Sequence, residues 1–130
     1  MSMSINSEGK MSPHSLFINA PDHKAFTAGQ TIYRAGETGR HMYGVVSGVV
    51  ELRKDSVVVA TLGANEVFGE RALIDHLPRH LTAVAIEDTS LAEIDHSLFL
   101  FLVHESPTFA LGIMGALAER LHAYDDAVTE

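Results

Sequence analysis

The residues that are best suited to chemistry lie close together between Phe68 and Thr82, flanked by two segments of strand-like composition. Gly69 would let a ligand approach the backbone closely, because glycine has no side chain. Amides that begin a short helical turn can hold an anion, and the guanidinium of Arg79 matches two phosphate oxygens. The carboxylate of Glu70 only accepts hydrogen bonds, so it suits a sugar hydroxyl. Together these residues predict a site for a sugar that is joined to a phosphate.

The segments around this stretch predict a sandwich or barrel of short β-strands. From about residue 26 to about residue 94, runs rich in β-branched residues alternate with glycine and other turn formers. The strands that we expect are residues 31–33, 42–46, 49–53, 57–62, 81–86 and 90–94. Apolar and polar residues alternate over 49–53, as in a half-buried strand. Lys54-Asp55-Ser56 then predicts a tight hairpin.

The final third of the chain has helical patterns. Asp95 or Ser97 is expected to cap a short helix over residues 98–103. Ser106 followed by Pro107 is a strong signal for the start of a second helix. Its apolar residues recur at helical spacing to about residue 126 and form one stripe: Phe109, Ile113, Met114, Leu117, Leu121 and Tyr124.

Composition restricts the class of protein. A chain of 130 residues with 46% hydrophobic residues suits one domain with a single core. The absence of cysteine excludes disulfides and thiolate metal sites and suits a reducing cytosol, so we expect a cytoplasmic protein. No apolar run is long enough to cross a bilayer, and the first ten residues do not form a signal peptide. The net charge of −8 opposes non-specific binding to DNA or to an anionic membrane.

The stretch from Phe68 to Thr82 resembles the phosphate-binding cassette of cyclic nucleotide-binding domains. Phe68-Gly69-Glu70 and Pro78-Arg79 stand at the family's spacing, and the similarity extends over about residues 24–126. The resemblance implies a mainly β fold, an eight-stranded double-sheet jelly roll with flanking short helices and a C-terminal helix from about residue 107. The polar composition of the N-terminus predicts a tail over residues 1–20, which leaves one domain over residues 21–130.

The resemblance also assigns roles to residues. Glu70 would accept a hydrogen bond from the ribose 2′-hydroxyl, and Arg79 would pair with the exocyclic phosphate oxygens. The ligand-binding set that it implies is Gly69, Glu70, Arg71, Ala72, Arg79, His80 and Leu81, with the backbone amides of Gly69, Ala72 and His80 taking part. The candidates for a lid over the base, on the last helix, are Leu117, Arg120, Leu121 and Tyr124. No catalytic residue, no metal and no cofactor other than the cyclic nucleotide is implied.

Three positions depart from the family pattern. His80 stands where alanine, serine or threonine is usual, and the lack of threonine or serine favours cyclic AMP over cyclic GMP. Its imidazole could point to solvent, assist the phosphate or block the pocket. Arg71 replaces a leucine and would be either solvated or a competitor of Arg79 for Glu70. Asn65 replaces a turn glycine, and asparagine tolerates the left-handed conformation.

We therefore expect a sensor of a cyclic nucleotide and not an enzyme. The last helix would change its posture on binding and would form a homodimer. Arg79→Ala is expected to abolish or greatly weaken nucleotide binding while leaving the fold intact. No membrane and no direct DNA contact is expected.

Several alternatives remain open at this point. The chain could be a ligand-free dimerisation module in which Glu70 and Arg79 form only a structural ion pair, or the sensor half of a transcription regulator that lacks its DNA-binding domain. A metal enzyme of the cupin type would need clustered histidines on strands, and none is present. His76 and His80 are four apart beside Asp75, but Pro78 interrupts a shared helical face.

Overall fold

The computed structural model describes residue 17 and residues 22–74 and 76–128. Within these residues, eight strands form two antiparallel sheets of four strands each. The first sheet has the order β1-β8-β3-β6, and the second has the order β2-β7-β4-β5. The strands are β1 (His23–Phe26), β2 (Thr31–Tyr33), β3 (Met42–Ser47), β4 (Val50–Lys54), β5 (Val57–Leu62), β6 (Val67–Phe68), β7 (Thr82–Ala85) and β8 (Thr89–Ile94). The double-sheet architecture predicted from the sequence is present.

Two tight turns lie at the positions that were predicted from the sequence. Lys54 pairs with Val57, so β4 and β5 are joined by only two residues, and Asp55 takes a left-handed φ of 56° there. Asn65 also has a positive φ, 72°, as expected of an asparagine in the place of a turn glycine. Strands β1 and β6 were not predicted from local patterns. β1 is largely exposed and β6 has only two residues, so neither carries the alternation of a half-buried strand.

Two groups of buried side chains hold the sheets and helices together. The inter-sheet core lies between the two sheets: Tyr33, Tyr43, Val45, Val50, Leu52, Leu62, Phe68, Ala83 and Leu91. The helix-facing core joins the first sheet to the helices: Phe17, Met42, Val67, Leu73, Ala92, Ile94, Leu102, Phe109 and Ile113. Phe17 belongs to the segment predicted as a polar tail, yet its side chain packs in this second core. The domain boundary at residue 21 stays a prediction.

Three helices accompany the sheets: α2 (Arg71–Ile74), α3 (His96–Glu105) and α4 (Pro107–Val128). The cap of α3 is Asp95, whose Oδ1 accepts a hydrogen bond from the amide of Leu98 at 2.8 Å. The hydroxyl of Ser106 accepts one from the amide of Phe109 at 3.3 Å and so begins α4. Both predicted helix starts are confirmed.

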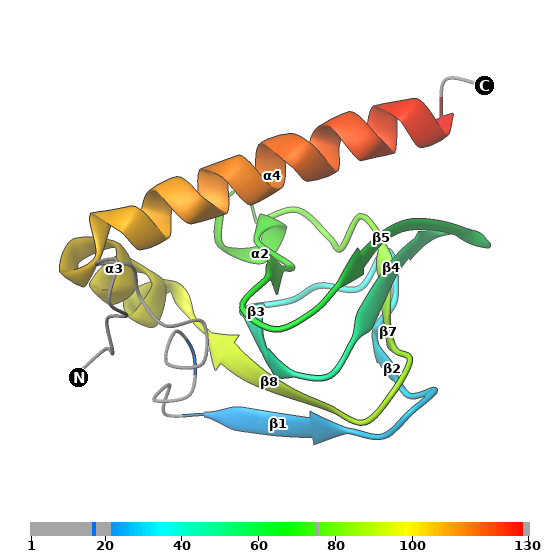
Figure 1. The fold of residues 1–130 in the computed structure, drawn as a ribbon, viewed down its shortest axis with the longest axis horizontal. Helices are drawn as coiled ribbons and strands as arrows, with labels where there is room; N and C mark the ends of the chain where they lie inside the picture. Colours follow the sequence, from blue (N-terminus) through cyan, green and yellow to red (C-terminus); the bar gives the residue numbers. More distant parts are fainter. Residues whose placement is uncertain (1–16, 18–21, 75, 129–130) are drawn as a thin grey trace, which may run out of the picture.

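Helix α4 is long and runs from α3 across α2 to β5 (Figure 1). Phe109 and Ile113 are buried, but Met114 of the predicted stripe is 63% exposed beside Leu111, which is 67% exposed. The part of the stripe that packs inward is therefore narrower than predicted. No single helix in the described part of the chain is long and apolar enough to cross a membrane; α3 and the start of α4 meet such a test only as a pair bent by 112°.

Candidate ligand-binding site

The predicted cassette links β6 to β7 through the single turn of α2. Gly69 follows β6 with a φ of +77°, a conformation that side chains rarely adopt. The carbonyl oxygen of Glu70 then accepts hydrogen bonds from the amides of Leu73 and Ile74, at 2.9 and 3.1 Å. The Gly-Glu pair therefore makes the sharp change from strand to helix that places Glu70 at the beginning of α2.

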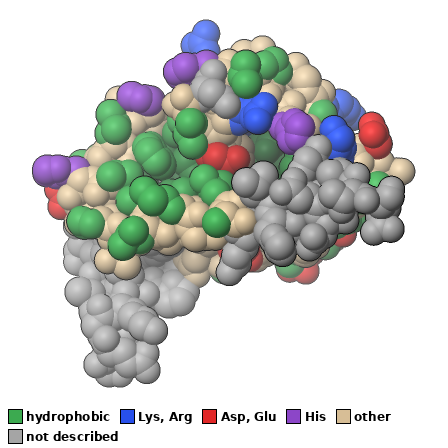
Figure 2. Space-filling view, turned by 90° about the horizontal axis from the view of Figure 1, so that it is seen from above, with side chains coloured by type: hydrophobic (Ala, Val, Ile, Leu, Met, Phe, Trp, Pro, Cys, Tyr) green, Lys and Arg blue, Asp and Glu red, His purple; other side chains and the backbone are tan. Residues whose placement is uncertain are grey.

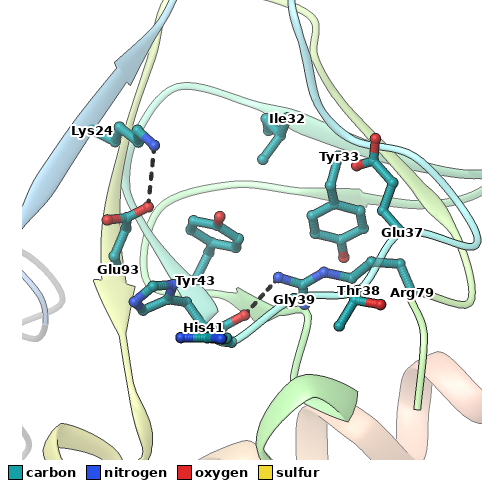
Figure 3. Close-up of a pocket in the computed structure, with 11 residues that line it drawn as sticks. Lys24, Ile32, Tyr33, Glu37, Thr38, Gly39, His41, Tyr43, Arg79 and Glu93 are labelled. Atoms are coloured by element: carbon teal, nitrogen blue, oxygen red, sulfur yellow. Dashed lines mark hydrogen bonds and ion pairs between the residues drawn. The ribbon is translucent and has the colours of Figure 1, made fainter. Parts of the chain in front are cut away.

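Arg79 is the buried charge of this cassette. Its side chain is 6% exposed, and its Nη1 donates a hydrogen bond to the carbonyl oxygen of Gly69 at 2.9 Å. Its Nη2 donates to the carbonyl oxygen of His41 at 2.8 Å (Figure 3). These bonds use two of the five N–H groups of a guanidinium, and the other three make no hydrogen bond to the described residues.

The backbone of Arg79 is tied to the β2–β3 loop, residues 34–41. Its amide donates to the carbonyl oxygen of Glu37 at 2.8 Å, and its carbonyl oxygen accepts from the amide of Gly36 at 2.8 Å. With the His41 contact, this gives Arg79 three hydrogen bonds to that loop. Arg79→Ala would keep the two backbone bonds and lose the side-chain bonds to Gly69 and His41, so the expectation that this variant keeps the fold stays a prediction.

An aromatic stack lies beneath the guanidinium. Its Cζ is 4.2 Å from the ring centroid of Tyr33 and 5.7 Å from that of Tyr43. Tyr43 in turn stacks on Phe68 with a centroid separation of 5.3 Å. Burial raises the pKa of Tyr43, with Glu93 adding to the rise and Arg79 opposing it. A cation over an aromatic face is attracted by the ring quadrupole, so the stack stabilises the charge of Arg79.

The structure does not contain the ion pair that the alternative interpretation requires. The polar partners of Arg79 are carbonyl oxygens, and no hydrogen bond or ion pair joins it to Glu70. Glu70 is half-buried. Arg79 thus makes no contact to Glu70 for which Arg71 could compete.

The other predicted cassette residues occupy varied environments. Ala72 is buried, and its amide donates to the carbonyl oxygen of Gly69 at 3.3 Å. Arg71 is half-buried, and Leu81 is half-buried against the inter-sheet core. His80 is exposed. Partial burial lowers the pKa of His80 below its usual value, and Arg71 and Lys54 lower it further, so cationic groups lie near its imidazole.

A cavity of about 460 Å³ borders Arg79 (Figure 3). Its lining combines the two tyrosines and Arg79 with residues of β1, β8 and the β2–β3 loop, among them Lys24 and Glu93. Glu70, Ala72 and His80 do not line it. Arg79 is therefore the one predicted ligand-binding residue that the structure brings to this cavity.

The lid candidates lie on α4. Leu117 is half-buried and packs against the helix-facing core. The side chains of Arg120, Leu121 and Tyr124 lie outside the described residues, so their role as a lid stays a prediction. In the face that α4 crosses, hydrophobic side chains gather at the α3 end, Lys and Arg side chains lie away from that end, and His side chains lie on both sides (Figure 2).

The metal alternative finds no support among the residues that the structure describes. No group of three or more histidine or acidic side chains there could hold a metal ion. His76 is exposed with a left-handed φ of 56°, and Asp75 lies outside the described residues.

Sequence reasoning missed the residues that hold Arg79 in place. Tyr33 and Tyr43 were counted only as strand residues, and His41 contributes a backbone carbonyl oxygen, which leaves no residue-type signature. Gly39 lies in the β2–β3 loop and carries no side chain that could mark it as part of a site. A side chain added there would overlap the guanidinium of Arg79, and only the fold reveals that closeness.

Comparison with known proteins identifies the family of this fold and cassette. The profile described as "Cyclic nucleotide-binding domain" matches residues 23–106. The chain is 34% identical over 107 residues to the cyclic AMP receptor protein of Thermus thermophilus, covering 78% of this chain and 50% of that protein. It is 35% identical over 111 residues to a cAMP-dependent protein kinase regulatory subunit of Eremothecium gossypii, covering 85% of this chain and 22% of that protein.

A solved structure agrees with these sequence matches. The catabolite activator protein of Thermus thermophilus superposes with a TM-score of 0.69 at 32% identity, over 90% of this chain and 62% of that one. The fold defines a cyclic nucleotide-binding jelly roll, and the chain belongs to the cyclic nucleotide-binding domain family. It spans about half the length of the Thermus receptor and about a fifth of the kinase subunit.

Proposed function

We propose that this domain reversibly binds a cyclic mononucleotide, with cyclic AMP preferred over cyclic GMP. The observation that carries the proposal is a buried guanidinium, Arg79, held at the end of a Gly69–Glu70 cassette without a carboxylate partner. A buried charge is costly unless something compensates it, and an anionic phosphate would complete the compensation. Names of relatives that refer to cyclic AMP support the same ligand.

In this proposal each cassette residue meets one part of the ligand. Arg79 pairs with the exocyclic phosphate oxygens through the N–H groups that it does not give to Gly69 and His41. Glu70 accepts a hydrogen bond from the ribose 2′-hydroxyl, and nearby backbone amides supply further donors. The preference for cyclic AMP rests on His80, because threonine or serine at this position goes with cyclic GMP in the family.

We further propose that binding repositions α4. The helix packs on the helix-facing core through Phe109, Ile113 and Leu117, and this core also contains Leu73 of the cassette helix α2. A shift of α2 toward the phosphate would therefore act on the packing of α4. The ligand must bind the two postures with different affinity for such a shift to signal anything.

One observation favours a second candidate, a ligand-free interaction module. Arg79 already donates to two backbone carbonyl oxygens, so it has a structural role even without a ligand. In that case the exposed Leu111 and Met114 of α4 would mediate the function by contact with another chain.

Isothermal titration calorimetry with cyclic AMP, cyclic GMP and adenosine 5′-monophosphate tests the proposal. We expect saturable binding of cyclic AMP at one site per chain, weaker binding of cyclic GMP, and much weaker binding of the linear nucleotide, which has the base and sugar but not the cyclic phosphate. If none of the three binds at millimolar concentration, the interaction module is the better interpretation.

A further inference from the structure

The ring of Tyr33 is held rigidly beneath the guanidinium of Arg79. Tyr33 ends β2, is 9% exposed and belongs to the inter-sheet core. Its ring contacts those of Tyr43 and Phe68, with centroid separations of 6.2 and 5.9 Å. Because both neighbours are themselves buried, the ring has little freedom to turn away from the cation above it.

Two glycines leave the space that the guanidinium occupies. A Cβ added at Gly69 would lie 2.8 Å from Nη1 of Arg79, and one added at Gly39 would overlap the guanidinium itself. The cation is therefore enclosed by the Tyr33 ring, by these two backbone segments and by the carbonyl oxygens of Gly69 and His41.

An aromatic partner differs chemically from the more usual carboxylate partner. A carboxylate would take two N–H groups of a guanidinium and cancel its charge, and so would compete with a phosphate. A ring face attracts the cation by its quadrupole and occupies no N–H group. The ring can therefore fix the position of Arg79 while leaving its charge and its remaining donors for an anion.

We propose that Tyr33 is a positioning residue for phosphate recognition: it sets the affinity for the cyclic nucleotide through the ring face that it presents to Arg79, without touching the ligand. This inference rests on the proposed function and adds to it a residue outside the cassette. It requires the flat aromatic face at position 33 and does not require the phenol oxygen.

The test compares Tyr33→Leu with Tyr33→Phe by calorimetric titration with cyclic AMP. Tyr33→Leu removes the ring and should raise Kd by about tenfold, the effect of losing a desolvated cation–π contact. Tyr33→Phe keeps the ring and should stay within about threefold of the native Kd. Leu62→Ala is the matched control, because Leu62 is 3% exposed in the same core but is not among the contacts of Arg79. It should lower the free energy of unfolding without raising Kd.

A second variant covers the case in which Tyr33→Leu does not fold. Gly39→Ala leaves the Tyr33 ring in place, but its added Cβ would overlap the guanidinium, which must then shift from its present position over the ring; this variant should also raise Kd by about tenfold. The inference is wrong if Tyr33→Leu or Gly39→Ala binds as the native chain does. It is also wrong if Tyr33→Phe loses as much affinity as Tyr33→Leu, or if Leu62→Ala weakens binding equally. A native chain that binds no cyclic nucleotide would instead remove the proposed function.

Discussion

Arg79 serves both the fold and the proposed site, and these two tasks are hard to separate by substitution. Its guanidinium joins the cassette to the β2–β3 loop through the carbonyl oxygens of Gly69 and His41. Removing the donor of a buried acceptor lowers the free energy of unfolding by more than the hydrogen bond contributed, because water does not replace the lost partner. An Arg79 variant that loses ligand binding therefore also needs a measurement of its stability, because unfolding alone would abolish binding.

Arg79→Ala should lower the free energy of unfolding of the ligand-free domain by about 2–4 kcal/mol, since it removes the donor to the His41 carbonyl oxygen and one of two donors to that of Gly69, and opens a cavity. Arg79→Lys should cost less, because it fills part of the space and keeps the charge, yet it should still weaken cyclic AMP binding since an ammonium lacks the planar fork. Urea unfolding without ligand measures the first effect. An unchanged midpoint for Arg79→Ala would mean that these contacts do not support the fold.

Because of His80, we expect both the stability of the domain and its affinity for cyclic AMP to depend on pH. Its pKa is lowered by partial burial and by Arg71 and Lys54, so the unfolded chain takes up this proton at a higher pH than the folded domain does. The His80 contribution should therefore reduce stability as pH falls through the usual histidine value of about 6.5. A bound phosphate near the imidazole would favour the cation, so cyclic AMP should bind more tightly as pH falls in the same range.

The pH test of His80 compares the native chain with His80→Ala in titrations between about pH 5.5 and 7.5. A slope in the native chain that vanishes in the variant supports a role at the phosphate. Equal slopes in both proteins would show that the exposed ring plays no part in binding. Binding by His80→Ala alone would show that the histidine blocks the pocket.

Among the secondary-structure elements, α3 begins with a cap whose contribution to the free energy of unfolding can be measured. The Asp95 side chain accepts from the amide of Leu98 and satisfies a donor that α3 leaves without a partner in the helix. Asp95→Ala should lower the free energy of unfolding by about 1 kcal/mol. Ser97→Ala is the control, because Ser97 was the other cap candidate and lies inside α3. Equal losses in urea unfolding of the two variants would contradict the assignment of the cap.

Some elements could be predicted from sequence because their signals are local. Proline after Ser106, the two-residue hairpin at Asp55 and the left-handed Asn65 each need only a few neighbouring residues. β1 and β6 are formed by pairing with distant strands, so no local pattern indicated them. The cassette residues matched a family pattern, but the support of Arg79 by Tyr33 and by the carbonyl oxygen of His41 arises only when separate strands come together.

The whole domain presents an outward apolar surface on α4. Leu111 and Met114 are 67% and 63% exposed, and Gly112 and Gly115 beside them would let a second backbone approach closely. Large exposed apolar side chains that gather on one element are typical of an interaction surface. This is consistent with the predicted homodimer through α4.

Sedimentation velocity at high micromolar concentration tests the homodimer. The native chain should sediment as a dimer, and Met114→Glu should shift it towards the monomer by placing a charge in the interface. Val57→Glu, at a position on β5 that is 51% exposed, should leave the dimer intact. A native chain that is monomeric throughout this range would contradict the prediction.

The central claim is that the cassette around Arg79 is the cyclic nucleotide site. Nuclear magnetic resonance of the ¹⁵N-labelled native chain during titration with cyclic AMP tests it most directly, because it reports each amide and the Arg79 Nε–H group separately. We expect saturable shifts of the Gly69, Ala72 and His80 amides together with the Arg79 Nε–H signal. Shifts confined to the cavity side, at Lys24 and Glu93, with the cassette unchanged, would contradict the account.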